Sequence, residues 1–101
     1  MNNKRVLVVD DEQGMCELLE IILQNEGYTV DTAPNVEQAC TQLSKSNYDV
    51  VITDLRIGSD KNAGMTLLTW IEENAQTTPA IMMTAHGSVE SAIEAMKRGA
   101  T

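Results

Sequence analysis

Residues 5–12 read RVLVVDDE, a run of apolar side chains that stops at two aspartates and a glutamate. A continuous apolar run of this length is typical of a strand that is covered on both faces of a sheet. Apolar residues then recur at helical spacing, and this stripe consists of Met15, Leu18, Leu19, Ile22 and Leu23. Gly27 follows, placed to end the helix in the left-handed conformation. The segment therefore predicts a buried strand over residues 5–9 and an amphipathic helix after it.

The same change of period, from strand to helix, recurs along the chain. Further strands are predicted at residues 28–32, 49–53 and 80–83. The residues predicted to form the helical stripes after them are Val36, Ala39, Cys40, Leu43, Leu67, Leu68, Ile71, Val89, Ala92, Ile93 and Met96. Asn35-Val36-Glu37-Gln38 resembles a capping box at the start of the second helix. This alternation with short connections predicts an α/β fold, a doubly wound parallel sheet with helices on both faces.

The composition limits which partners the protein can bind and where in the cell it is expected. The chain has 15 Asp and Glu against 7 Lys and Arg, a formal net charge of −8, which opposes direct contact with nucleic acid. The first apolar run is too short for a signal peptide or a membrane span, so we expect a cytoplasmic protein without membrane contact. Cys16 and Cys40 are isolated and lack metal-binding spacing, and we expect both to be reduced.

Oxygen-bearing side chains follow three of the predicted strands. Asp10 and Asp11 come after the first strand, Asp54 after the third and Thr84 after the fourth. Ligands of open α/β sheets bind outside the carboxyl ends of the strands, so neighbouring strands would bring these groups to one rim. Clustered carboxylates repel one another, and a hard divalent cation such as Mg²⁺ relieves the repulsion. A carboxylate beside such a cation can also attack phosphorus, which makes Asp54 the candidate nucleophile and Thr84 a candidate ligand of the phosphoryl oxygens.

At this point the chain resembles the response-regulator receiver domains of bacterial two-component systems. The matching segments are residues 6–12, 49–57, 83–87 and 95–100. Residues 84–100 are most similar to the enhancer-binding, nitrogen-regulatory class, which activates transcription with an alternative sigma factor. The resemblance implies a flavodoxin-like (CheY-like) parallel sheet with the strand order 2-1-3-4.

The resemblance also implies a role for each candidate residue. Asp54 would accept a phosphoryl group from a phosphohistidine of a sensor histidine kinase, and Thr84 would be the switch hydroxyl. Asp10 and Asp11 would hold Mg²⁺, together with Asp54 and the backbone carbonyl of Arg56. The domain would then act as a phosphorylation switch rather than a turnover enzyme. It would control linked ATPase and DNA-binding output domains beyond residue 101.

Two departures from the family pattern stand out. The loop after Asp54 carries about two extra residues within residues 58–63. The lysine that the family places after its fifth strand would fall about five residues beyond Thr101. Residues 1–101 are therefore expected to be a C-terminally incomplete receiver domain without its fifth strand and fifth helix. The exposed edge of the fourth strand then predicts self-association, with a homodimer as one form.

Two other functions remain open from the residues. A Mg²⁺-dependent phosphatase of the haloacid-dehalogenase type has a nucleophilic aspartate at a strand end as well. Such an enzyme uses a second acid two residues after the nucleophile, where this chain has Arg56. The other alternative is a pseudo-receiver, which binds partners without phosphate chemistry.

Overall fold

The computed structural model describes residues 4–54, 62–74 and 78–83. Strands and helices alternate in it: β1 (Arg5–Val9), α1 (Gln13–Asn25), β2 (Thr29–Ala33), α2 (Val36–Lys45), β3 (Val50–Asp54), α3 (Ala63–Asn74) and β4 (Ala80–Met83). The strands form one parallel sheet in the order β2-β1-β3-β4. The predicted α/β class and strand order are confirmed, although β2 and β3 each lie one residue later than predicted. The predicted fourth helix lies outside the described residues.

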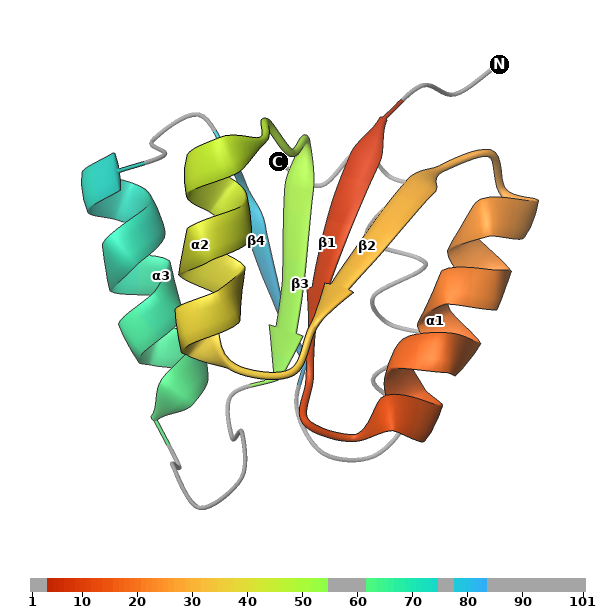
Figure 1. The fold of residues 1–101 in the computed structure, drawn as a ribbon, viewed down its shortest axis with the longest axis horizontal. Coiled ribbons are helices and arrows are strands. Elements are labelled where there is room, and N and C mark those ends of the chain that lie inside the picture. Colours follow the sequence, from red (N-terminus) through yellow and green to blue (C-terminus); the bar gives the residue numbers. More distant parts are fainter. Residues whose placement is uncertain (1–3, 55–61, 75–77, 84–101) are drawn as a thin grey trace.

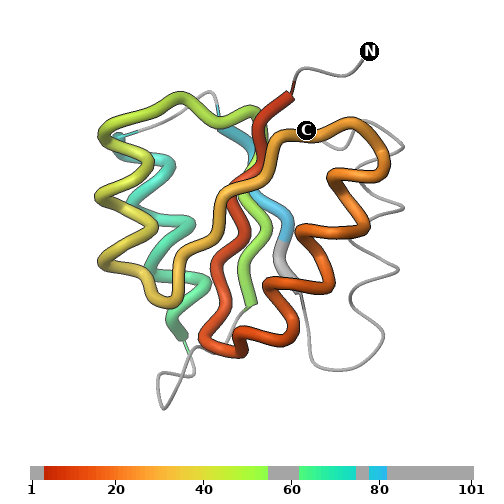
Figure 2. Tube along the Cα trace, turned by 45° about the vertical axis from the view of Figure 1, so that its right-hand side comes forward, coloured from red at the N-terminus to blue at the C-terminus, as the bar shows by residue number. Residues whose placement is uncertain are grey.

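The sheet separates two apolar layers. Helices α2 and α3 cover one face and α1 covers the other (Figure 1, and turned by 45° in Figure 2). Successive side chains of a strand point to opposite faces, so Val6 and Val8 pack toward α1, whereas Leu7 and Val9 pack toward α2 and α3. All four are fully buried, which explains why β1 is apolar throughout.

Helix α1 uses a narrower apolar face than its sequence suggests. Its buried residues are Cys16, Leu19 and Leu23. The prediction that Leu18 belongs to the core stripe is wrong, because its side chain is 46% exposed. Ile21 is also exposed, at 59%. The helix is turned so that its face centres on Leu19, which places Leu18 at the solvent side.

The ends of the helices follow the local signals in the sequence. Gly27 has φ of 94°, the left-handed conformation expected after α1. Asn35 is the N-cap of α2, and its side chain accepts a hydrogen bond of 2.8 Å from the backbone N–H of Gln38. Helix α1 therefore ends shortly before β2, and α2 begins shortly after it.

A polar network ties the edge strand β2 to β1 and α2. The Tyr48 hydroxyl lies 2.7 Å from Oδ2 of Asp31 and 3.0 Å from Oε1 of Gln42. Asp31 also accepts a hydrogen bond of 3.0 Å from the guanidinium of Arg5, which lies 5.0 Å from the centre of the Tyr48 ring. Burial, followed by the interaction with Asp31, raises the pKa of Tyr48 to about 12, so the hydroxyl remains a donor.

We predict that Tyr48→Phe lowers the free energy of unfolding by about 1.5 kcal/mol, because it removes a hydrogen bond to a carboxylate. Chemical denaturation of the two proteins measures this difference. Tyr28→Phe is the matched control, since the Tyr28 hydroxyl has no hydrogen bond within the described part of the chain. Equal losses in the two variants would show that the network does not stabilise the fold.

Among the helices within residues 4–54 and 62–74, none is long and apolar enough to cross a membrane.

Candidate functional site

Two carboxylates meet at the carboxyl edge of the sheet. In the pairing of β1 with β3, Val9 lies opposite Thr53, and the next residues are Asp10 and Asp54. Asp54 is the last residue of β3 and is paired with Met83 of β4. The order β2-β1-β3-β4 therefore brings the ends of β1, β3 and β4 side by side, at the lower edge of Figure 1. This is the rim at which parallel α/β sheets bind ligands.

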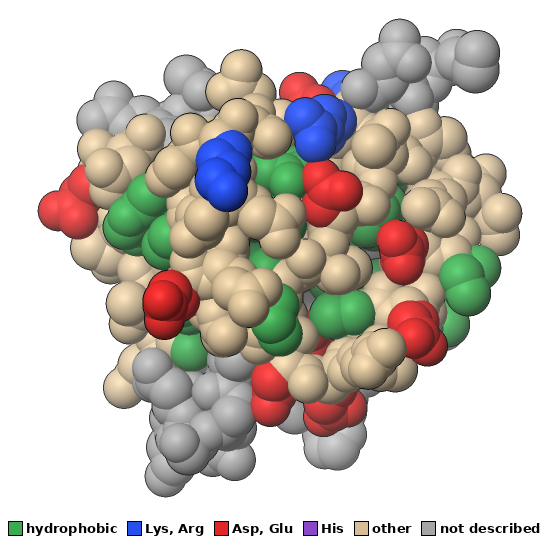
Figure 3. Space-filling view, viewed as in Figure 1, with side chains coloured by type: hydrophobic (Ala, Val, Ile, Leu, Met, Phe, Trp, Pro, Cys, Tyr) green, Lys and Arg blue, Asp and Glu red, His purple; other side chains and the backbone are tan. Residues whose placement is uncertain are grey.

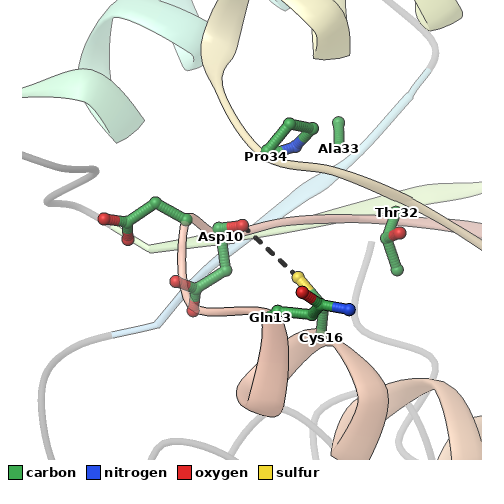
Figure 4. Close-up of a pocket in the computed structure, with 7 residues that line it drawn as sticks. Asp10, Gln13, Cys16, Thr32, Ala33 and Pro34 are labelled. Atoms are coloured by element: carbon green, nitrogen blue, oxygen red, sulfur yellow. Dashed lines mark hydrogen bonds between the residues drawn. The ribbon is translucent and has the colours of Figure 1, made fainter.

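Asp10 is held on several sides. It is only 4% exposed. Its backbone N–H donates to the carbonyl of Ala33 at 3.1 Å, and its Oδ1 accepts from the backbone N–H of Glu12 at 3.0 Å. Its backbone carbonyl accepts from the thiol of Cys16, with the sulfur 3.4 Å away (Figure 4). The carboxylate therefore has a defined position in a largely dry environment.

Burial raises the pKa of Asp10 from 3.8 to about 6. The hydrogen bond from Glu12 opposes this shift, whereas the charge of Asp54 and the neighbouring Asp11 add to it. The negative charges of Asp54 and Asp11, the other two candidate metal ligands, therefore act on the Asp10 carboxylate. A cation bound at this rim would offset the energetic cost of burying the charged Asp10 carboxylate and the repulsion between Asp10, Asp11 and Asp54.

The remaining candidate residues divide into two groups. Asp11 is exposed and Asp54 is half-buried. Arg56 and Thr84 lie outside the described residues, as do most residues of the loop with the predicted insertion; Asn62 and Ala63 are its described part. Thr84 directly follows Met83, the partner of Asp54 in the sheet. Within the described ranges, no group of three or more His, Cys, Asp or Glu side chains is placed so that it could hold a metal ion by itself.

A pocket of about 280 Å³ opens beside the carboxylates, between the ends of β1 and β2 (Figure 4). Its lining residues are Asp10, Asp11, Gln13, Cys16, Thr32, Ala33 and Pro34. The prediction from strand ends did not include Cys16, whose apolar environment and contact with Asp10 depend on how α1 packs. Burial raises the pKa of the Cys16 thiol to about 11, so it carries its proton at neutral pH.

The family model of the response regulator receiver domain matches residues 6–101. The chain belongs to the response regulator receiver family. Over 100 residues it is 37% identical to the response regulator protein PilR of Pseudomonas aeruginosa, covering 99% of this chain and 22% of PilR. The receiver domain thus spans about a fifth of the length of the curated relatives that it matches.

Solved structures of receiver proteins show the same fold. The crystal structure of TrrA from Thermotoga maritima, in complex with Mg²⁺ and BeF, has a TM-score of 0.75 and 36% identity, covering 92% of this chain and 79% of TrrA. The solution structure of a beryllofluoride-activated NtrC4 receiver domain dimer has a TM-score of 0.73 and 35% identity, covering 93% of this chain and 76% of that one. These findings favour the receiver interpretation over the phosphatase.

The charge of this receiver domain is unevenly distributed. In the view of Figure 3, the basic side chains lie toward the upper edge, whereas acidic side chains are spread over the face and include a group at the lower edge, where the strands end. The exposed acids next to the rim include Asp11 and Glu12. Such a field attracts cations to the carboxyl edge of the sheet.

Proposed function

We propose that this receiver domain is a phosphorylation switch in which Asp54 is the phosphoacceptor. The observation that carries the proposal is the position of Asp54 at the end of β3, next to the buried Asp10 whose pKa its charge raises. A half-buried carboxylate at this rim is accessible to a donor, whereas Asp10 is almost entirely enclosed.

In the proposed step, a carboxylate oxygen of Asp54 attacks the phosphorus of a phosphohistidine. A P–O bond to Asp54 forms and the P–N bond to the imidazole breaks. The electron pair of that bond stays on the imidazole nitrogen, which is protonated by solvent. The product is an acyl phosphate on Asp54. Water then hydrolyses this acyl phosphate, which releases inorganic phosphate, restores the Asp54 carboxylate and resets the switch. We propose that the domain acts as such a switch rather than as a turnover enzyme.

The carboxylates at the rim fit Mg²⁺, because they offer oxygen donors and share excess negative charge. We propose that Asp10, Asp11 and Asp54 hold the ion together with the backbone carbonyl of Arg56. When bound, Mg²⁺ would neutralise charge on the carboxylates and on the phosphoryl oxygens. The complex of the similar TrrA with Mg²⁺ and BeF supports this choice of metal.

Thr84 is the proposed switch hydroxyl. Thr84 directly follows Met83, the residue that pairs with Asp54 in the sheet, and this adjacency in sequence supports the role. A hydroxyl that hydrogen-bonds the phosphoryl oxygens would link modification of Asp54 to movement of the segment after β4.

The proposed partners follow from the relatives. A sensor histidine kinase would supply the phosphoryl group to this domain in the cytoplasm. Several similar proteins carry transcriptional regulatory names and are much longer than this chain, which supports a transcription-regulating output domain. The dimer formed by the similar NtrC4 receiver supports a homodimer as one state of the domain.

Titration with Mg²⁺ tests the proposed metal site. We predict that millimolar Mg²⁺ shifts the backbone amide signals of Asp10, Asp11 and Asp54 in two-dimensional NMR spectra. Amides at the opposite end of the sheet, such as that of Asp49, serve as the internal control. If the rim signals stay unmoved while the domain is folded, the metal site is absent, and the pseudo-receiver becomes the better interpretation.

A further inference from the structure

The turn between β1 and α1 fixes Asp10 through contacts with three segments. The backbone N–H of Asp10 joins it to Ala33 at the end of β2, and Glu12 binds its Oδ1 from within the turn. The third contact comes from α1, where the thiol of Cys16 reaches back to the Asp10 carbonyl at 3.4 Å. The strand end, the turn and the helix start are thereby joined at one residue.

Cys16 is itself anchored in the core. Its side chain is 7% exposed and belongs to the apolar cluster that includes Val8 and Leu19. Its backbone N–H donates to the carbonyl of Glu12 at 3.1 Å, in the first turn of α1. The thiol therefore links the Asp10 backbone to the packed interior, whereas the hydrogen bond from Glu12 holds the Asp10 carboxylate within the turn.

We propose that Cys16 is a positioning residue for the metal site. By donating its thiol proton to the Asp10 carbonyl, it would hold the backbone from which the Asp10 carboxylate, a proposed Mg²⁺ ligand, projects. This inference rests on the proposed function, because it concerns the affinity of that site for Mg²⁺. It adds a residue that contacts neither the metal nor the phosphoryl group.

The expected size of the effect follows from the chemistry of the donor. A thiol is a weak hydrogen-bond donor. Groups that orient metal ligands nevertheless have large effects on affinity, so we expect Cys16→Ala to weaken Mg²⁺ binding about tenfold. Cys16→Ser retains a donor at this position and is expected to bind Mg²⁺ within about threefold of the wild-type domain.

The experiment compares the Mg²⁺ dissociation constants of the wild-type domain, Cys16→Ala and Cys16→Ser, each obtained from amide shifts in an NMR titration. Cys40→Ala is the matched control, since Cys40 is a half-buried thiol on α2, on the other face of the sheet. We expect this control to bind Mg²⁺ as the wild-type domain does.

Two results would overturn the positioning role. One is wild-type Mg²⁺ affinity in a folded Cys16→Ala domain, and the other is equal weakening in the alanine and serine variants, which would show a packing effect. Neither result affects the proposed function, which fails instead if the wild-type domain does not bind Mg²⁺ at the rim.

A second measurement applies even if Cys16→Ala does not fold. The infrared S–H stretch of the wild-type domain lies in a window free of other protein bands, and Cys40→Ala leaves the band of Cys16 alone. We expect a band at the lower frequency of a hydrogen-bonded thiol. A band at the frequency of an unbonded thiol would contradict the proposal.

Discussion

Asp54→Asn is expected to reduce phosphorylation of the domain by more than about a hundredfold, because the amide oxygen is a poor nucleophile toward phosphorus. The reaction uses an acyl phosphate of low molecular weight as donor with Mg²⁺ present, and intact-protein mass spectrometry measures the fraction of phosphorylated chain. Asp49→Asn is the matched control. It makes the same change just before β3, at the opposite end of the strand, where Asp49 is exposed.

The Asp54→Asn domain also offers a test that it is folded with its site intact. Removing the charge of Asp54 is expected to lower the pKa of Asp10 from about 6, since that charge contributes to the raised value. Carboxyl carbon shifts in a pH titration report this change. Undiminished phosphorylation of Asp54→Asn would show that another residue accepts the phosphoryl group.

Asp10→Asn is expected to stabilise the metal-free domain and to weaken its response to Mg²⁺. The folded state raises the pKa of Asp10 from 3.8 to about 6. Between these two pKa values the folded state binds more protons than the unfolded state. The contribution of Asp10 to the free energy of unfolding is therefore fully present below pH 3.8 and is lost as the pH rises through 6. At pH 7.5 the buried charge then destabilises the domain by about 3 kcal/mol, which the neutral amide avoids.

Urea denaturation without metal at about pH 4 and pH 7.5 measures this effect. The stability gain of Asp10→Asn is expected at the higher pH and is expected to shrink at the lower one. A variant that loses stability at both pH values would mean that the Asp10 carboxylate stabilises the fold, contrary to the effect of its burial.

Much of the fold could be predicted from local patterns. Arg5–Val9 and Ala80–Met83 are strands with the predicted bounds, and Gly27 and Asn35 mark the helix ends as expected. Leu18 was assigned to the wrong face, because several apolar residues of α1 fit a helical stripe and only packing against the sheet selects among them.

The candidate site was predictable to the extent that it depends on where strands end. Asp10 and Asp54 are neighbours because β1 and β3 are adjacent in the sheet. The contact between Cys16 and the Asp10 carbonyl was not predictable, since it depends on how the first turn of α1 meets the strand end. The roles of Asp10, Asp11, Asp54 and Thr84 stay predictions from the strand ends and the family resemblance, and the role of Arg56 stays a prediction from the resemblance alone.

The most direct test of whether Asp54 is the phosphoacceptor is to locate the phosphoryl group on the wild-type domain. After phosphorylation with Mg²⁺, borohydride reduces an aspartyl phosphate to homoserine, and peptide sequencing by mass spectrometry identifies the position. We expect homoserine at position 54 and at no other aspartate. Homoserine at position 10 or 11, or a folded domain that binds Mg²⁺ but yields no homoserine, would contradict this expectation.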